Sequence, residues 1–130
     1  MFIKGNPSVY IDENIKNGKY ILDSNSSTGK TYLYKTLNNM RQLNENVVGY
    51  SYIDFLNKGD LVSILRNEKP KVVMIDRYNR FYTDKRINDA LQEYTDGIVL
   101  ISFKGNINPL PYTGDAEVIL DKDVIKVELL

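Results

Sequence analysis

Short apolar runs and polar interruptions alternate along the first hundred residues of the chain. Four such runs are bounded by polar or turn-forming residues, at 19–23, 47–53, 72–75 and 98–103. Runs of this length that are rich in Val, Ile and Tyr indicate β-strands. The runs at 72–75 and 98–103 do not alternate between apolar and polar residues, which is typical of strands buried on both faces. The pattern therefore predicts a sheet that is covered on both sides.

The segments between these strands show the spacing of helices. In segment 30–43, apolar residues recur at i, i+4 and i+7, as Leu33, Leu37 and Met40. This stripe predicts a helix with one apolar face. Two shorter helices are expected from similar patterns, one around 61–65 and one that begins after a cap at Thr83 or Asp84.

The order of these elements predicts the topology. Strands that alternate with helices indicate βαβ units with right-handed crossovers, and hence a parallel sheet. Near the C-terminus, segments 116–120 and 124–129 look like two strands of a hairpin. The first 18 residues are expected to form a small β element beside the main sheet. A chain of 130 residues fits one domain, 1–130.

Composition removes whole classes of chemistry. The chain has no His, Cys or Trp, so Ser-His-Asp and Cys-His catalysis, disulfides and His/Cys zinc sites are excluded. Seventeen basic residues balance 17 acidic ones, which argues against a general polyanion binder. Carboxylates, Lys, Arg, hydroxyls and backbone amides remain, and this inventory suits phosphate chemistry with an oxygen-liganded metal such as Mg²⁺.

A candidate phosphate-binding loop follows the first of the four runs. It consists of Ser24, Asn25, Ser26, Ser27, Thr28, Gly29, Lys30 and Thr31. The segment fits the Walker A pattern G-x-x-x-x-G-K-[ST], except that Ser24 replaces the first Gly. Backbone amides of such a loop and the N-terminus of the following helix attract a phosphate. Lys30 would then contact the terminal phosphates, and the Thr31 hydroxyl would bind Mg²⁺.

The chain thereby resembles the P-loop NTPase superfamily, and the run from Ser26 to Thr31 is particularly like the loops of its RecA-like and AAA-type branch. The resemblance extends from Tyr20 to about Leu129, because the order of strands and helices also fits. It implies an α/β, three-layer P-loop fold with a mainly parallel sheet flanked by helices and a C-terminal β-hairpin. It also implies that ATP and Mg²⁺ are the cofactors.

A second acidic site is expected at the end of segment 71–76, which resembles a Walker B strand and ends in Asp76. Asp76 would hold Mg²⁺ beside the phosphates. Relatives often carry Glu directly after this Asp, to orient the attacking water, whereas this chain has Arg77. Asp54 is the best substitute, and Ser102 falls where relatives often place a sensor of the γ-phosphate. The missing Glu predicts slow hydrolysis.

A basic aromatic segment follows at 77–86. It carries Arg77, Arg80, Lys85 and Arg86 against Asp84, which is a local charge of 4 − 1 = +3. Three interpretations stay open. The segment is a solvated loop and helix face, a contact with another subunit or protein, or a site for single-stranded nucleic acid.

The function expected from these observations is that of an ATP-binding protein with weak or partner-dependent Mg-ATPase activity. The alternative is a catalytically degenerate module that binds a protein or a nucleic acid, of the kind that phages or mobile elements encode. The longest apolar run, 98–101, is far shorter than the ~20 residues that span a membrane. We therefore expect a cytoplasmic protein without membrane contact.

Overall fold

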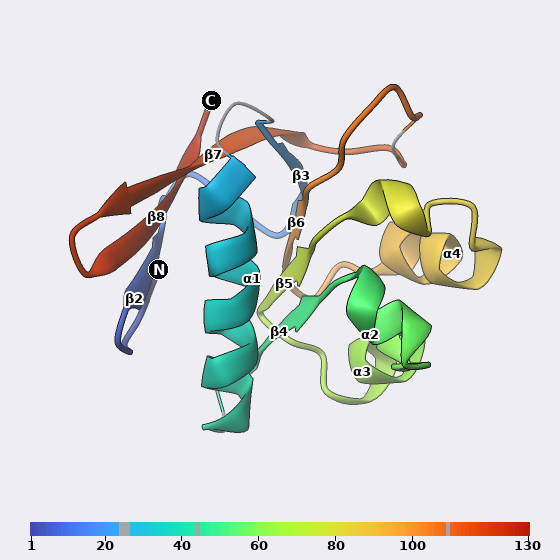
Figure 1. Cartoon of the computed structure of the whole chain (residues 1–130), viewed down its shortest axis with the longest axis horizontal. Coiled ribbons are helices and arrows are strands. Elements are labelled where there is room, and N and C mark those ends of the chain that lie inside the picture. The colour runs from blue at the N-terminus through green and yellow to red at the C-terminus, as the bar shows by residue number, and fades with distance from the viewer. Residues whose placement is uncertain (24–26, 44, 109) are drawn as a thin grey trace.

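The computed structural model describes residues 1–23, 27–43, 45–108 and 110–130, and it forms one sheet with helices packed on it (Figure 1). The described strands are β1 (Phe2–Ile3), β2 (Ser8–Ile11), β3 (Gly18–Leu22), β4 (Val47–Tyr50), β5 (Val72–Ile75), β6 (Ile98–Ile101), β7 (Gly114–Asp121) and β8 (Val124–Leu129). The described helices are α1 (Ser27–Gln42), α2 (Tyr52–Leu56), α3 (Leu61–Asn67), the 3₁₀ turn η1 (Tyr78–Arg80) and α4 (Lys85–Glu93).

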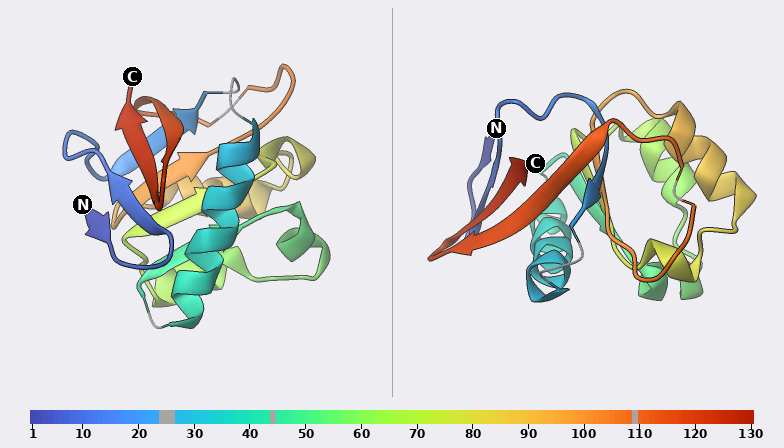
Figure 2. Two further views of the ribbon diagram at one scale, coloured as in Figure 1. Left: turned by 60° about the vertical axis from the view of Figure 1, so that its left-hand side comes forward. Right: turned by 90° about the horizontal axis from the view of Figure 1, so that it is seen from above.

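The sheet is mixed, and its strand order is β1-β2-β8-β7-β3-β6-β5-β4. Five neighbouring pairs are parallel, from β7 through β3, β6 and β5 to β4 and also between β2 and β8. Two pairs are antiparallel, namely β1 with β2 and β7 with β8. The sheet curls like half of a barrel, as the view from above shows (Figure 2).

The expected three-layer P-loop fold, with a mainly parallel sheet flanked by helices, is therefore wrong for the molecule as a whole. The reason is the pairing of β2 with β8, which brings the first residues into the main sheet instead of beside it. On one side, the sheet curls around α1 through strands β1, β2, β8 and β7 (Figure 2). The second helical layer, formed by α3 and α4, packs on the other face, against β4, β5 and β6. The C-terminal hairpin of β7 and β8 is present.

Two apolar clusters lie on the two faces of the sheet. The predicted stripe of Leu33, Leu37 and Met40 is confirmed, because all three side chains are buried on the concave face. In β5, alternate residues go to opposite faces: Met74 joins the cluster around α1, and Val73 joins the cluster around α3 and α4. This division explains why β5 and β6 are apolar at every position. Each fully buried Leu or Val contributes about 1.5–3 kcal/mol to folding.

Local capping sets where the elements on this second face begin. The Asp84 side chain accepts a hydrogen bond from the Ile87 amide at 2.9 Å, which confirms the cap expected for α4. The strand expected over 47–53 ends earlier, because Ser51 begins α2 with a capping box to Asp54. The chain therefore turns away from the sheet directly after Tyr50.

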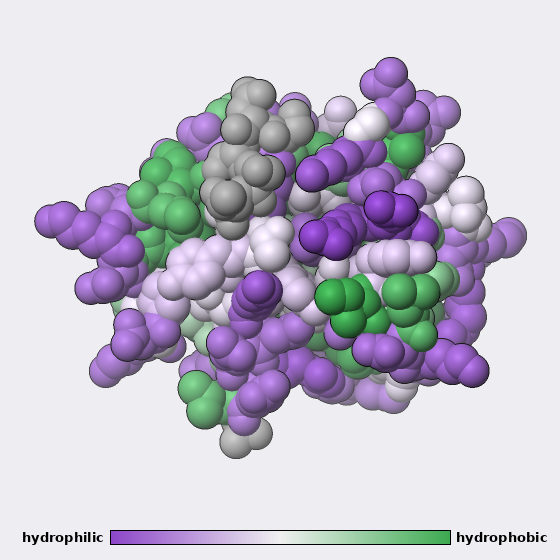
Figure 3. Space-filling model, in the orientation of Figure 1, coloured by the Kyte–Doolittle hydropathy of each residue, from purple (hydrophilic) through white to green (hydrophobic). Residues whose placement is uncertain are grey.

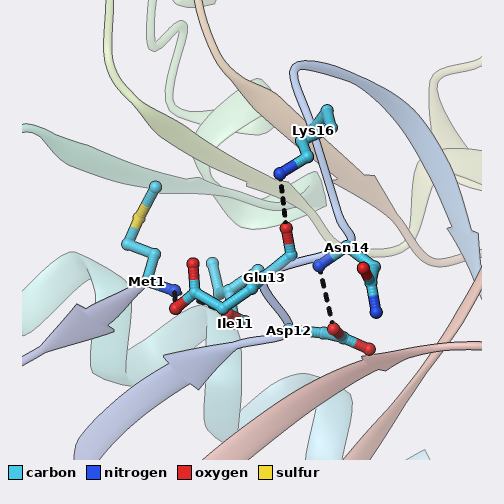
Figure 4. Close-up of polar contacts among 6 residues, drawn as sticks. All are labelled: Met1, Ile11, Asp12, Glu13, Asn14 and Lys16. Carbon is cyan, nitrogen blue, oxygen red and sulfur yellow. Dashed lines mark hydrogen bonds and ion pairs between the residues drawn. The ribbon is translucent and has the colours of Figure 1, made fainter.

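The N-terminal turn is fastened to the sheet by charged groups (Figure 4). The amino group of Met1 donates to the Ile11 carbonyl at 2.7 Å and to Glu13 Oε1 at 2.6 Å. Asp12 accepts from the amides of Asn14 at 2.9 Å and Leu129 at 3.1 Å. These hydrogen bonds hold the pKa of Asp12 below its usual value and tie the first strands to β8.

Among the helices that the structure describes, none has the length and apolarity to cross a bilayer.

Candidate functional site

A cleft of about 480 Å³ lies where the first turns of α1 meet the loops that follow β5 and β6. Neighbouring parallel strands end at the same edge of a sheet. The residues that follow β3, β5 and β6 therefore lie close together at that edge. The residues that line the cleft are Lys30, Thr31, Tyr32, Lys35, Asp76, Arg77, Asn79, Ser102, Phe103 and Lys104. The structure thus brings together four of the residues predicted for nucleotide and metal binding, Lys30, Thr31, Asp76 and Ser102, with Arg77 of the basic aromatic segment.

Lys30 and Asp76 are the buried charges of this cleft. Their exposed fractions are 5% and 4%. Burial lowers the pKa of Lys30, while the carboxylates of Asp23 and Asp76 oppose that change. Burial also raises the pKa of Asp76, against the opposing effects of Arg77, Lys30 and Lys104. Two charged groups are thus kept out of water at the base of the cleft, which is costly unless they have a partner.

Backbone hydrogen bonds fix the position of Ser102 beside Asp76. The Ser102 amide donates to the Ile75 carbonyl at 2.8 Å, and its carbonyl accepts from the Tyr78 amide at 2.9 Å. The Asp76 amide in turn donates to the Tyr50 carbonyl at 2.8 Å. The ends of β4, β5 and β6 are therefore tied together, and the Ser102 side chain is buried at the cleft.

The predicted loop is described only in part. Ser24, Asn25 and Ser26 lie outside the described residues, and so do the side chains of Ser27 and Thr28. Helix α1 begins at Ser27, so Gly29, Lys30 and Thr31 lie in its first two turns. The described part of the segment therefore places the cleft beside the N-terminal end of a 16-residue helix.

Asp54 does not reach this cleft. Its Oδ2 accepts hydrogen bonds from the Tyr34 hydroxyl at 2.7 Å and from the Ser51 amide at 2.8 Å. Burial and this carboxylate raise the pKa of Tyr34 far above its usual value. Asp54 instead lines a separate groove between α1 and α3. Its capping role in α2 explains this placement, which the sequence pattern at the end of a strand does not reveal.

The basic aromatic segment does not form one continuous site. Arg77 lines the cleft, but the Arg80 guanidinium lies 5.7 Å from the centre of the Tyr52 ring. The other two cations are held in ion pairs, Lys85 with Asp89 at 2.6 Å and Arg86 with Asp60 at 3.4 Å. These two residues lie in α4 and are not among the residues that line the cleft. The four residues therefore have three different surroundings.

Sequence reasoning missed Lys35, Asn79 and Lys104 in the cleft lining. Lys35 follows Thr31 by one helical turn, so helical spacing places both on the same face. Lys104 comes shortly after β6, in the same way as Asp76 follows β5. These signals were available, because any polar residue just beyond a strand of a parallel set reaches the same edge.

The described lining holds four cationic side chains and one carboxylate, which favours an anionic ligand. Thr31 and Asp76 offer oxygen ligands for a cation, and no cluster of three or more acidic residues suited to a metal occurs in the described ranges. Comparisons with protein-family models, with curated proteins and with solved structures found no match. The functional argument therefore depends on the geometry of the cleft.

Proposed function

We propose that the cleft binds Mg·ATP. The observation that carries the proposal is the buried pair of Lys30, in the opening turns of α1, and Asp76, at the end of β5. A buried ammonium group near a helix N-terminus is suited to a phosphate, because the helix dipole and the fixed charge act in the same direction. A polyphosphate would add its negative charge to that of Asp23 and Asp76 beside this buried lysine.

Each residue has a definite role in this proposal. Lys30 binds the β- and γ-phosphates, and the described backbone amides of the predicted loop, from Ser27 to Thr31, surround them. The Thr31 hydroxyl and the Asp76 carboxylate hold Mg²⁺, which neutralises phosphate charge when it is bound. Ser102 contributes a hydroxyl from the neighbouring strand end. The burial of Asp76 supports this role, since a bound cation would stabilise its ionised form.

Hydrolysis is slow in this proposal. Among the described lining residues, Asp76 is the one carboxylate, and it is assigned to the metal. Asp54, the candidate for orienting water, is engaged by Tyr34 and Ser51 at a separate groove. Loss of a group that positions water leaves binding intact while slowing the chemical step. Turnover would therefore require a residue from another chain.

Titration calorimetry with Mg·ATP tests the proposal on the native protein and on Lys30→Ala. We expect the substitution to weaken binding by about 10- to 100-fold, the range for loss of one charge-assisted hydrogen bond. Lys19→Ala is the matched control, because burial also lowers the pKa of Lys19, which lies at the opposite end of β3. The absence of binding heat for the native protein at millimolar nucleotide would overturn the proposal.

A binding module without catalysis is the second candidate, and the surface around α2 favours a protein partner for it. Ile53 and Leu56 are 58% and 57% exposed, and hydrophobic surface is visible in this region (Figure 3). Salt bridges at Lys85 and Arg86 leave the basic segment less suited to nucleic acid. Binding to a labelled single strand at low salt tests the nucleic-acid branch, since such binding weakens as salt rises.

A further inference from the structure

Arg77 has a backbone conformation that a side chain disfavours. Its φ is 55°, in the left-handed region that is costly for residues with a Cβ. The described non-glycine residues that share a positive φ are Lys58, Lys69 and Lys122, and none of them lines the cleft. Arg77 thus combines a strained backbone with a place in the candidate site.

The two residues that follow Arg77 are fastened to the segment after β6. The Tyr78 amide donates to the Ser102 carbonyl at 2.9 Å, and the Lys104 amide donates to Asn79 Oδ1 at 3.0 Å. These two bonds connect the strand ends that carry Arg77 and Lys104. The surroundings therefore hold the unfavourable conformation in place, and both cationic residues lie at the same cleft.

Arg77 and Lys104 take part in none of the salt bridges found among the described residues. By contrast, Arg41, Arg86 and Lys126 each contact a carboxylate within 4 Å, at 2.7, 3.4 and 2.8 Å. Both cleft cations are also exposed, so they remain available to a ligand.

We propose that Arg77 and Lys104 bind the γ-phosphate from the exposed side of the cleft, together with Lys30, and make the cleft prefer a triphosphate to a diphosphate. The inference rests on the proposed function. Lys30 is buried at the base of the cleft and the other two residues are exposed, so positive charge continues outward to solvent. ADP lacks the γ-phosphate that these cations would contact, and a guanidinium matches two oxygens of such a group at once.

Binding of Mg·ATP and Mg·ADP is compared by calorimetry for the native protein, Arg77→Asn and Lys104→Ala. Asn tolerates the left-handed conformation, so Arg77→Asn removes charge without forcing the backbone to change. We expect each variant to bind ATP about tenfold more weakly and ADP less than about twofold more weakly. Lys58→Asn is the control, because Lys58 has φ 60° and lies outside the cleft lining.

The control should leave both affinities unchanged, and neither Asn variant should lower the melting temperature. Equal weakening for ATP and ADP, no weakening, or a melting temperature lowered in Arg77→Asn but not in Lys58→Asn would overturn the inference. Absence of binding of either nucleotide to the native protein would contradict the proposed function, and the inference with it. Native binding of both nucleotides with an unchanged preference in the variants would contradict the inference alone.

Discussion

The two halves of the sheet bury their strands in different ways. In the parallel half, β3, β6, β5 and β4 have α1 on one face and α3 and α4 on the other (Figure 2). In the curled half, β1, β2, β8 and β7 cover α1 with one face, and their other residues are partly exposed. The cleft lies at the carboxyl edge of the parallel half, where strand ends converge. The cleft therefore depends on parallel strands whose following loops meet the N-terminal end of α1.

Described salt bridges occur in both halves of the sheet, but none of them involves Arg77 or Lys104 of the cleft. In the curled half, the amino group of Met1 pairs with Glu13 at 2.6 Å, and Lys126 pairs with Asp121 at 2.8 Å. At the cleft, Arg77 and Lys104 have no such salt bridge within the described chain. The four cations of the described lining share one carboxylate and repel one another, so they favour an anionic ligand over the empty cleft.

The largest expected effect tests whether the halves fold together. Leu37 of α1 is fully buried in the cluster that both halves share. Leu37→Ala should lower the free energy of unfolding by about 2–5 kcal/mol, through lost burial and the cavity left behind. Urea unfolding followed by far-UV and tyrosine signals should remain one transition. Leu43→Ala, at a site 76% exposed, should change stability by less than about 0.5 kcal/mol. Two separate transitions would show that the halves are independent.

The next prediction compares Gly97→Ala with Gly114→Ala, to test how closely the backbone is packed in each half. A Cβ on Gly97, which precedes β6, would lie 2.3 Å from the Pro70 carbonyl oxygen. A Cβ on Gly114, in β7, would meet Tyr20 ring carbons at 3.8 Å, which is ordinary contact. Gly97→Ala should therefore cost about 1–3 kcal/mol in the same unfolding assay, and Gly114→Ala about 0.5 kcal/mol or less. Equal costs would mean that the parallel half has no tighter backbone packing.

Local patterns predicted the elements well but not the sheet as a whole. Helix α1 and strands β5 and β6 follow from apolar spacing, because burial on one face or on two faces leaves different periodicities. The pairing of β2 with β8 joins residues more than a hundred positions apart, and no local pattern records such a partner. The C-terminal hairpin could be predicted from the sequence, but its pairing with the N-terminal strands could not.

Some residues of the candidate site could be predicted from the sequence and others could not. Lys30 and Asp76 were predicted to meet because each stands at a junction of a strand and a turn or helix, and the topology brings such junctions to one edge. Asp54 was predicted by the same rule, but its local bond to the Ser51 amide starts α2 and redirects the chain. Capping within three residues thus overrides the general rule for residues at strand ends.

A smaller effect concerns the buried carboxyl of the cleft. Burial raises the pKa of Asp76, so its ionised form is less favourable in the folded than in the unfolded chain. This cost is present above the folded pKa and disappears as the pH falls through it. Asp76→Asn should therefore raise the free energy of unfolding by about 0.5–2 kcal/mol near pH 7, with a smaller gain near pH 4. Urea unfolding without nucleotide measures this directly.

The same substitution separates a metal role from a structural one. With Mg·ATP, Asp76→Asn should bind with little dependence on Mg²⁺, because the proposed metal ligand has lost its charge. An equal Mg²⁺ dependence in both proteins would contradict the metal role. If Asp76→Asn were less stable than the native protein near pH 7, this would contradict the view that the buried Asp76 carboxylate destabilises the fold.

The substitution with the smallest expected effect, Lys126→Ala, removes a cation that forms a salt bridge in the curled half. Lys126 and Asp121 are partly exposed, and a salt bridge of this kind contributes little, since water and salt screen it. Lys126→Ala should shift the melting temperature by less than about 2 °C. It should also leave the affinity for Mg·ATP within about twofold of native. Lys126→Ala changes the net charge as much as Arg77→Asn does, so equal losses of ATP affinity would attribute binding to net charge. Different losses would attribute it to the cations of the cleft.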